Sequence, residues 1–295
     1  MIAPKLERNG TIGLCAPSHV ATEADYAPRI AAMQREGFAV KTADNMFKAT
    51  HGYLASPKER AADIRQLFAD ESVELLLFGG GEGAGEVLPY LDFDLMRAHP
   101  KRMASYSDGT TILNAVWAQT GLTTYYGAAP RIFDAYSAYD RENVETHLMQ
   151  EKAAAHVNSG HWHTARPGKA EGILVGGYTR NFALLLGSKY FPIDLEQKYI
   201  LFLEDHEMFG GVDYVSAMIS HMEQSAFWPC VTGVLFGHYS REKNAWLTER
   251  LARLGERYGI PAAYCDDFGH GDNHGILEIG RKAVLDTQEQ TLVYL

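Results

Sequence analysis

Short apolar runs alternate with longer segments of helical periodicity along the first part of the chain. The runs at 11–16, 38–42 and 73–78 predict buried strands, and the apolar spacing over 23–35 predicts a helix. A second helix is expected to begin at Ser56, where a Ser-Pro-Lys-Glu run supplies a cap, a first-turn proline and a capping-box glutamate. Strands and helices that alternate in this way favour a parallel sheet covered on both faces, with functional groups at the carboxyl ends of its strands.

The apolar pattern changes in the second part of the chain. Over 131–168 it weakens into a polar stretch that ends at Arg-Pro-Gly, which predicts a linker. Beyond the linker, strands are expected at 171–177, 199–203, 231–236, 262–265 and in a closing hairpin of 283–286 and 291–295, with helices at 181–186, 213–224 and 245–257. We therefore predict an α/β fold with an N-terminal domain over 1–130 that has a parallel sheet, and a smaller β-rich C-terminal domain over 169–295.

Composition and charge restrict the binding partners and the cellular compartment that we expect for this protein. With 46% hydrophobic and 22% charged residues, the 295-residue chain has the make-up of a globular protein with a sizeable core. A net charge of −10 without a compensating basic run disfavours a nucleic-acid polymer or an anionic membrane as partner. Three cysteines lie far apart in apolar surroundings, and no apolar run approaches 18 residues. We expect a cytoplasmic protein with reduced cysteines.

The stretch 101–120 places a serine at a sharp turn. An apolar segment ends near Tyr106, and apolar residues at helical spacing begin after Thr110, so Ser107 lies between a strand and a helix. Such a turn exposes a hydroxyl beside the unpaired N–H groups of the helix start, which suits a nucleophile. The Gly-x-Ser-x-Gly elbow is matched loosely, with Ser105 in the first position. The alternative is that Ser107 or Asp108 is simply the N-cap of the helix.

A glycine cluster, 79–85, directly follows the predicted strand at 73–78. It fits a dinucleotide fingerprint in part, which leaves a nucleotide-binding protein as one alternative, although Pro89 interrupts the helix that should follow. A glycine-rich strand end also allows close approach of the backbone and offers N–H donors. The second use suits an oxyanion hole.

Acidic and histidine residues complete the candidate chemistry. Glu204 follows an apolar strand and could orient a histidine. We expect the neighbouring residues 205–207 to form an ordinary solvated strand end. His270 and His274 lie in an Asp- and Gly-rich loop, but without a helix or an HExxH pattern we expect no metal. Ser107, Glu204 and His270 form a possible triad, and their chain order leaves open whether they meet.

Taken together, the ordered motifs resemble the LD-carboxypeptidase family of serine peptidases, which includes muramoyltetrapeptide carboxypeptidases and microcin-C immunity peptidases. The motifs cover nearly the whole chain. They are Gly-Thr-Ile-Gly-Leu-Cys-Ala-Pro-Ser at 10–18, His-Gly-Tyr-Leu-Ala at 51–55, Val-Leu-Pro-Tyr-Leu-Asp-Phe-Asp at 87–94, Tyr-Ser-Asp at 106–108, Thr-Gly-Leu at 120–122, Gly-Gly at 176–177, Leu-Phe-Leu-Glu-Asp at 201–205 and Phe-Gly-His at 268–270.

The resemblance implies a Rossmann-like N-terminal domain without a nucleotide, a β-rich C-terminal domain, a triad at their interface, a homodimer and no cofactor. It assigns the nucleophile to Ser107, the general base to His270 and the orienting acid to Glu204. The backbone N–H of Asp108 and one from the turn of Gly80 and Gly81 would form the oxyanion hole.

The expected function is that of a serine carboxypeptidase that releases a terminal D-amino acid from a murein-derived LD-peptide during cell-wall recycling. An alternative within the family is an amidase that acts on a peptidyl or aminoacyl nucleotide, with Trp162 stacking on the base. From another class, the chain could be a ligand-binding protein without catalysis. Three departures from the family pattern stand out. The run Gly79-Gly-Gly-Glu82 loses a cation and an aromatic residue, and its added carboxylate is expected to disfavour anionic substrates. Ser105 replaces a usual glycine before the nucleophile, and Glu278 replaces a common proline.

Overall fold

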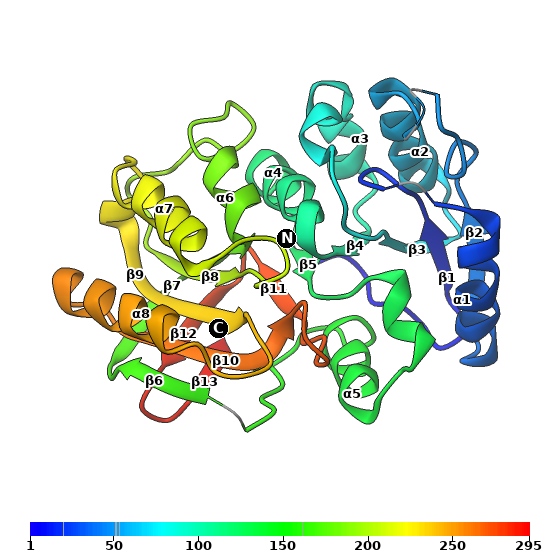
Figure 1. Cartoon of the computed structure of the whole chain (residues 1–295). Coiled ribbons are helices and arrows are strands. Elements are labelled where there is room, and N and C mark those ends of the chain that lie inside the picture. Colours follow the sequence, from blue (N-terminus) through cyan, green and yellow to red (C-terminus); the bar gives the residue numbers. More distant parts are fainter. Residues whose placement is uncertain (20, 51, 53, 161) are drawn as a thin grey trace.

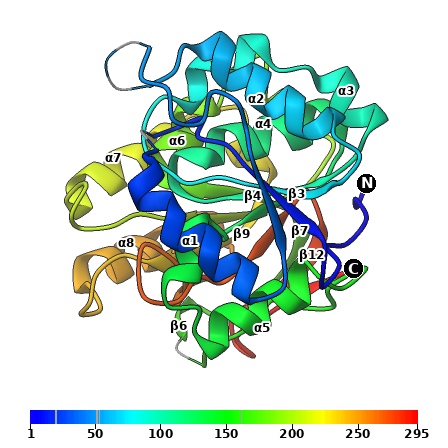
Figure 2. The ribbon, with the colours of Figure 1, turned by 90° about the vertical axis from the view of Figure 1, so that its right-hand side faces the viewer.

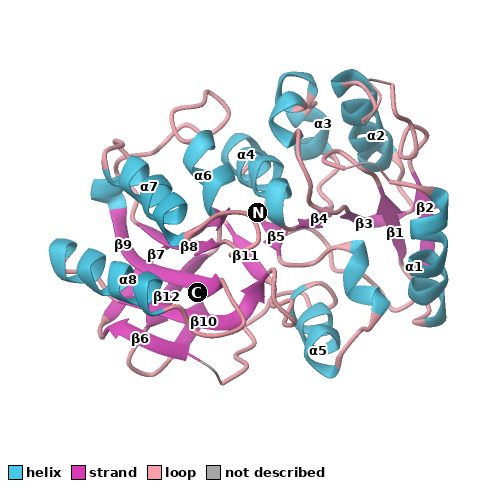
Figure 3. Ribbon diagram, viewed as in Figure 1, coloured by secondary structure: helices cyan, strands magenta, loops and turns pink. Residues whose placement is uncertain are grey.

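Two β-sheets form the framework of the computed structural model, which describes residues 1–19, 21–50, 52, 54–160 and 162–295 (Figure 3). His51 and Tyr53 of the 51–55 motif lie outside the described residues. The first sheet has the strand order β11-β5-β4-β3-β1-β2 (Figure 1). Its strands are β1 (Thr11–Leu14), β2 (Ala39–Thr42), β3 (Val73–Leu77), β4 (Arg102–Ser105), β5 (Thr124–Tyr126) and β11 (Leu277–Ile279). The first five are parallel, and β11 pairs antiparallel with β5.

Helices cover both faces of this sheet, which confirms the predicted architecture. They are α1 (Glu23–Arg35), α2 (Pro57–Ala69), α3 (Phe93–Ala98), α4 (Thr110–Thr120) and α5 (Ala138–His147). In Figure 2, α2 and α3 lie on one side of the strands and α1 and α5 on the other. The predicted capping box is present, because the Ser56 hydroxyl accepts the Glu59 N–H and the Glu59 carboxylate accepts the Ser56 N–H.

The second sheet has the order β13-β12-β7-β8-β9-β10-β6 and confirms the β-rich C-terminal part. Its strands are β6 (Trp162–Arg166), β7 (Lys169–Tyr178), β8 (Tyr199–Glu204), β9 (Val231–His238), β10 (Ala262–Gly269), β12 (Lys282–Asp286) and β13 (Thr291–Tyr294), with helices α6 (Thr179–Leu185), α7 (Val212–Glu223) and α8 (Ala245–Tyr258). Strands β7 to β10 are parallel, and the predicted closing hairpin β12–β13 joins β7 antiparallel.

The stretch 131–168, predicted as a linker, contains regular structure. It holds α5 and the edge strand β6, which belongs to the second sheet. The apolar pattern missed both because α5 buries only Val144 among aliphatic residues and β6 has the mostly polar sequence Trp-His-Thr-Ala-Arg. The domain limits themselves stay a prediction, and β11 from the C-terminal part joins the first sheet.

The strand order brings the carboxyl ends of several strands to one place. In the first sheet the order β2-β1-β3-β4-β5 reverses direction between β1 and β3, the position where α/β proteins bind ligands. The segments that follow β3 and β4 meet there, and those that follow β8 and β10 reach the same region from the second sheet. Within the described ranges, no helix is long and apolar enough to cross a membrane.

The contacts of Glu278 explain why the proline of the family pattern is absent at this position. Its N–H donates to the Tyr294 hydroxyl (3.1 Å), a bond that a proline could not form. Its buried carboxylate accepts hydrogen bonds from Arg281 Nη1 (2.6 Å) and His147 Nδ1 (3.0 Å). The cluster therefore ties β11 to α5, through His147, and to β13, through Tyr294.

We predict that Glu278→Ala lowers the free energy of unfolding by about 3–5 kcal/mol, since it leaves the Arg281 charge buried without its partner. Urea denaturation of the variant and wild type measures the difference. Glu289→Ala is the control, because Glu289 is exposed and its loss should change stability by less than about 0.5 kcal/mol. Equal stability of both variants would contradict a structural role for the buried cluster.

Candidate active site

Ser107 occupies the sharp turn that the sequence indicated. Strand β4 ends at Ser105, and Ser107 adopts a φ of +55°, a left-handed conformation that is uncommon for non-glycine residues and recurs at active sites. The turn is braced by Thr110 Oγ1, which donates to the Ser107 carbonyl (2.6 Å). Gly109 is required here, because a Cβ at this position would lie 2.1 Å from Ser105 Oγ.

The capping alternative for Ser107 and Asp108 is wrong. Neither side chain caps α4 or the short 3₁₀ turn before it. The Asp108 carboxylate instead accepts the Ala84 N–H (2.7 Å) and the Asn181 amide (2.5 Å). The serine hydroxyl is therefore available for another partner.

That partner is His270, which links Ser107 to Glu204 in one hydrogen-bonded row. His270 Nε2 lies 3.1 Å from Ser107 Oγ, and His270 Nδ1 lies 2.8 Å from Glu204 Oε2. A buried carboxylate accepts the Nδ1–H, so Nε2 carries the lone pair that faces the serine hydroxyl. The fold thus brings together the three residues predicted from the sequence, one from the first sheet and two from the second. Such a row can move a proton from the serine hydroxyl to the imidazole.

Tyr126, at the end of β5, is a site residue that the sequence interpretation missed. Its hydroxyl donates to Glu204 Oε1 and accepts the Ser107 N–H (3.0 Å). Burial, followed by the nearby Glu204 charge, raises the pKa of Tyr126 well above its ordinary value, so the phenol stays a donor. The only sequence signal was the aromatic pair before Gly127, in a short run that no periodicity marked as a strand.

Aromatic rings surround the imidazole of His270. The ring centroids of Tyr106, Tyr178 and Phe209 lie 5.2, 5.4 and 5.1 Å from its own. Phe209 is 59% exposed, so it forms an apolar rim beside the row. These contacts hold the ring orientation that both hydrogen bonds of His270 require.

Asp205 is buried, so the expectation of a solvated strand end after Glu204 is wrong. Its side chain is fully buried, and Oδ1 accepts the His206 N–H (2.8 Å). Burial raises the pKa of Asp205 to about 6, and the neighbouring Glu204 charge acts in the same direction. The site therefore contains a second buried carboxyl group beside Glu204.

The glycine turn after β3 lies against the nucleophile. A Cβ on Gly80 would be 2.4 Å from Ser107 Cβ, and a Cβ on Gly81, which has a φ of +147°, would be 2.1 Å from the Ser18 carbonyl oxygen. The N–H groups of Gly80 and Gly81 make no hydrogen bond to any residue within the described ranges. Free N–H groups beside a nucleophile suit an oxyanion hole. Short 3₁₀ turns follow the glycines where a dinucleotide site would need an α-helix, which weakens the nucleotide-binding alternative.

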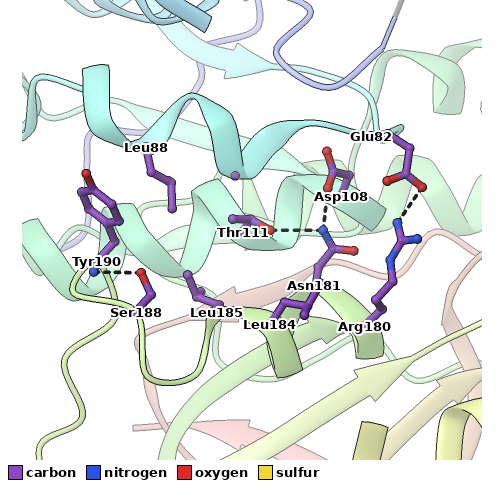
Figure 4. A pocket seen from close by; sticks show the side chains of 11 residues that line it. Glu82, Leu88, Asp108, Thr111, Arg180, Asn181, Leu184, Leu185, Ser188 and Tyr190 are labelled. Carbon is purple, nitrogen blue, oxygen red and sulfur yellow. Dashed lines mark hydrogen bonds and ion pairs between the residues drawn. The ribbon is translucent and has the colours of Figure 1, made fainter.

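A cavity of about 450 Å³ lies beside Asp108 (Figure 4). One end is polar and the other apolar. Its lining includes Glu82, Asp108, Arg180 and Asn181 at the polar end and Leu88, Leu185 and Tyr190 at the apolar end, with Leu184 beside Asn181. Glu82 accepts a hydrogen bond from Arg180 Nη2 (2.6 Å). The Glu82 charge is therefore paired with a guanidinium, and its effect on anionic substrates stays a prediction.

Trp162 and His274 do not join the row. Trp162 is buried in β6 with its indole N–H donated to Asp267 (2.6 Å), so the structure does not support a base-stacking role for it. His274 bonds to Asp140 and Arg131, whereas His270 bonds to Ser107 and Glu204. The two histidines of the Asp- and Gly-rich loop thus serve separate networks.

Comparisons with known proteins find similar sequences and a similar fold. Two family models match, the LD-carboxypeptidase N-terminal domain over residues 12–127 and the LD-carboxypeptidase C-terminal domain over residues 171–285. The chain is 29% identical to the probable murein peptide carboxypeptidase of Bacillus subtilis, over 98% of this chain and 92% of that protein. It is 24% identical to the microcin C7 self-immunity protein MccF of Escherichia coli, over 99% of this chain and 95% of that protein. The crystal structure of an MccF-like protein from Bacillus anthracis shares the fold, with a TM-score of 0.87 at 24% identity over 100% of this chain and 99% of that one.

We predict that Tyr126→Phe destabilises the fold by about 1–3 kcal/mol, because it leaves a buried Glu204 oxygen and the Ser107 N–H without a partner. Denaturant unfolding measures the loss. Tyr125→Phe is the matched control, since Tyr125 precedes it in the same strand and its hydroxyl has no hydrogen-bond partner among the residues the structure describes. A loss no larger than that of the control would show that the Tyr126 hydroxyl does not hold the site together.

Proposed function

Since this chain belongs to the LD-carboxypeptidase family of serine-type carboxypeptidases, we propose that Ser107, His270 and Glu204 are its catalytic triad. The observation that carries the proposal is the row of hydrogen bonds from Ser107 Oγ to His270 Nε2 (3.1 Å) and from His270 Nδ1 to Glu204 Oε2 (2.8 Å). Nucleophile, base and orienting acid are in contact without any rearrangement of the chain.

The reaction begins with attack of Ser107 Oγ on the carbonyl carbon of the scissile amide, while His270 Nε2 takes the hydroxyl proton. The resulting oxyanion accepts hydrogen bonds from the Asp108 N–H and from the turn of Gly80 and Gly81. His270 then gives the proton to the leaving amine, the C–N bond breaks, and an acyl-enzyme remains. Water, deprotonated by His270, hydrolyses the ester and restores the serine.

Glu204 serves this sequence by holding the imidazole and by stabilising the imidazolium that forms. Its side chain is fully buried, so its charge acts on His270 with little screening by water. Tyr126 occupies the other carboxylate oxygen, which leaves Oε2 for His270.

The substrate class that we propose is an LD-peptide derived from murein, from which the enzyme releases a terminal D-amino acid. The name of the Bacillus subtilis relative, a probable murein peptide carboxypeptidase, supports this class. The second candidate is an amidase acting on peptidyl or aminoacyl nucleotides, supported by the similarity to MccF. It has less support, because the tryptophan expected to stack on a base is buried. A cytoplasmic homodimer, as the family resemblance implies, is part of the same proposal.

We predict that Ser107→Ala and His270→Ala each lower kcat by about 10⁴-fold without additive losses, because triad members act as a unit. Glu204→Gln should cost less, since it keeps the shape and loses the charge. Release of D-alanine from a murein tetrapeptide, followed by mass spectrometry, measures the rates. A fluorophosphonate probe should label the wild type and not Ser107→Ala. Labelling or turnover that persists in Ser107→Ala would end the triad proposal.

The Glu82–Arg180 ion pair leads to a prediction on specificity. Glu82→Gln frees the Arg180 guanidinium beside the cavity, so kcat/KM on an anionic tetrapeptide should rise, and Arg180→Gln should lower it. Because Glu82 is 70% exposed, each change is expected to be at most about five-fold, corresponding to about 1 kcal/mol. The effect should shrink at high salt. If both variants match the wild type at low salt, the pair is a surface contact without influence on the substrate.

A further inference from the structure

Arg131 is a cation near the proposed triad that differs from its neighbours in its partners. Arg29, Arg141 and Arg180 each bond to a carboxylate, on Asp134, Glu36 and Glu82. Arg131 has no carboxylate partner within the part of the chain that the structure describes. Its Nη2 lies 3.0 Å from His274 Nε2, and its Cζ lies 5.0 Å from the centroid of the Tyr106 ring. The residue is partly exposed, so its remaining N–H donors can reach a ligand.

A half-buried histidine, itself bonded to a buried aspartate, orients this guanidinium. Arginine only donates, so His274 Nε2 must accept, and the ring hydrogen is then on Nδ1, which lies 3.0 Å from Asp140 Oδ1. Burial opposes ionisation of Asp140, but its hydrogen bonds from His274 and Ser137 hold the pKa of that carboxyl below the ordinary value. Asp140 therefore accepts the Nδ1–H, and the lone pair of His274 Nε2 faces Arg131.

The ring of Tyr106 contacts both the Arg131 guanidinium and the imidazole of His270, the proposed base. Tyr106 directly precedes the nucleophile, its ring faces Arg131 at 5.0 Å, and the same ring lies 5.2 Å from the ring of His270. His274 also lies in the loop that carries His270, so one short segment positions both the imidazole and the arginine. Arg131 follows β5, whose carboxyl end lies at the same sheet edge as that of β4.

We propose that Arg131 binds the free carboxylate of the amino acid that the enzyme releases, which rests on the proposed carboxypeptidase activity. A carboxypeptidase must recognise this carboxylate, which is one carbon away from the amine that His270 protonates. A guanidinium fork matches a carboxylate with two parallel hydrogen bonds. The other arginine near the nucleophile, Arg180, is already neutralised by Glu82, whereas Arg131 keeps its full charge for a ligand. His274 is the positioning residue of this subsite.

The test compares a murein tetrapeptide that ends in D-alanine with the same peptide ending in D-alaninamide. The wild type should prefer the acid, and Arg131→Gln should reduce the acid-to-amide ratio of kcat/KM by about 10- to 100-fold, the range for hydrogen bonds to a charged group. Arg131→Lys should fall between them, since it keeps the charge without the fork. Arg141→Gln is the matched control, because Arg141 also stacks on a tyrosine, Tyr136, but pairs with Glu36, and it should leave the ratio unchanged.

An unchanged ratio in Arg131→Gln, or equal losses on both peptides, would overturn the carboxylate subsite and make Arg131 a structural link. A wild type that cleaves neither peptide would instead refute the proposed function. Binding then decides the subsite separately: calorimetry of acid and amide peptides with Ser107→Ala, with and without Arg131→Gln, should show an acid preference only where Arg131 is present. Thermal unfolding of each variant verifies that it is folded.

Discussion

The fully buried carboxylate of Glu204 is the constraint on which the site depends. An ionised carboxylate away from water is unstable unless hydrogen bonds replace its hydration. Here the replacements come from Tyr126, in the first sheet, and from His270, which follows the second. Because the Tyr126 hydroxyl also accepts the Ser107 N–H, one buried charge holds the serine turn, the histidine and the two sheets in a single arrangement.

The arrangement also requires backbone segments to approach each other closely. Ser107 holds a positive φ, and the segments around it must come nearer than side chains allow. Gly80 passes the Ser107 side chain from one direction, and Gly177, at the end of β7, would place a Cβ 2.4 Å from Thr110 Oγ1. Glycine at these positions lets the end of the second sheet dock on the start of α4, so the same residues that shape the turn also join the two halves.

Local pairing, rather than net charge, sets the electrostatic surroundings of individual carboxylates. The chain carries a formal charge of −10, yet Glu82 and Glu278 are each offset by an arginine within hydrogen-bond distance. Arg131 contacts a histidine nitrogen and an aromatic face rather than a carboxylate, so its charge is not cancelled in the same way. An acidic protein can therefore still present a positive subsite to an anionic ligand.

The sequence by itself predicted most of the strands and helices, the α/β class and Ser107, Glu204 and His270 as candidate site residues, because periodicity, capping signals and ordered motifs are local properties of a chain. It missed Tyr126, since a three-residue strand has too few positions for a period. It misjudged Asp205, which is buried, and it held no signal for the partners of Glu82 and Trp162. Their surroundings come from residues 27, 98 and 105 positions away, namely Tyr178, Arg180 and Asp267, and no local pattern records such neighbours. Only the tertiary structure decided which charges are paired, which carboxyl groups are buried and which arginine is left for a ligand.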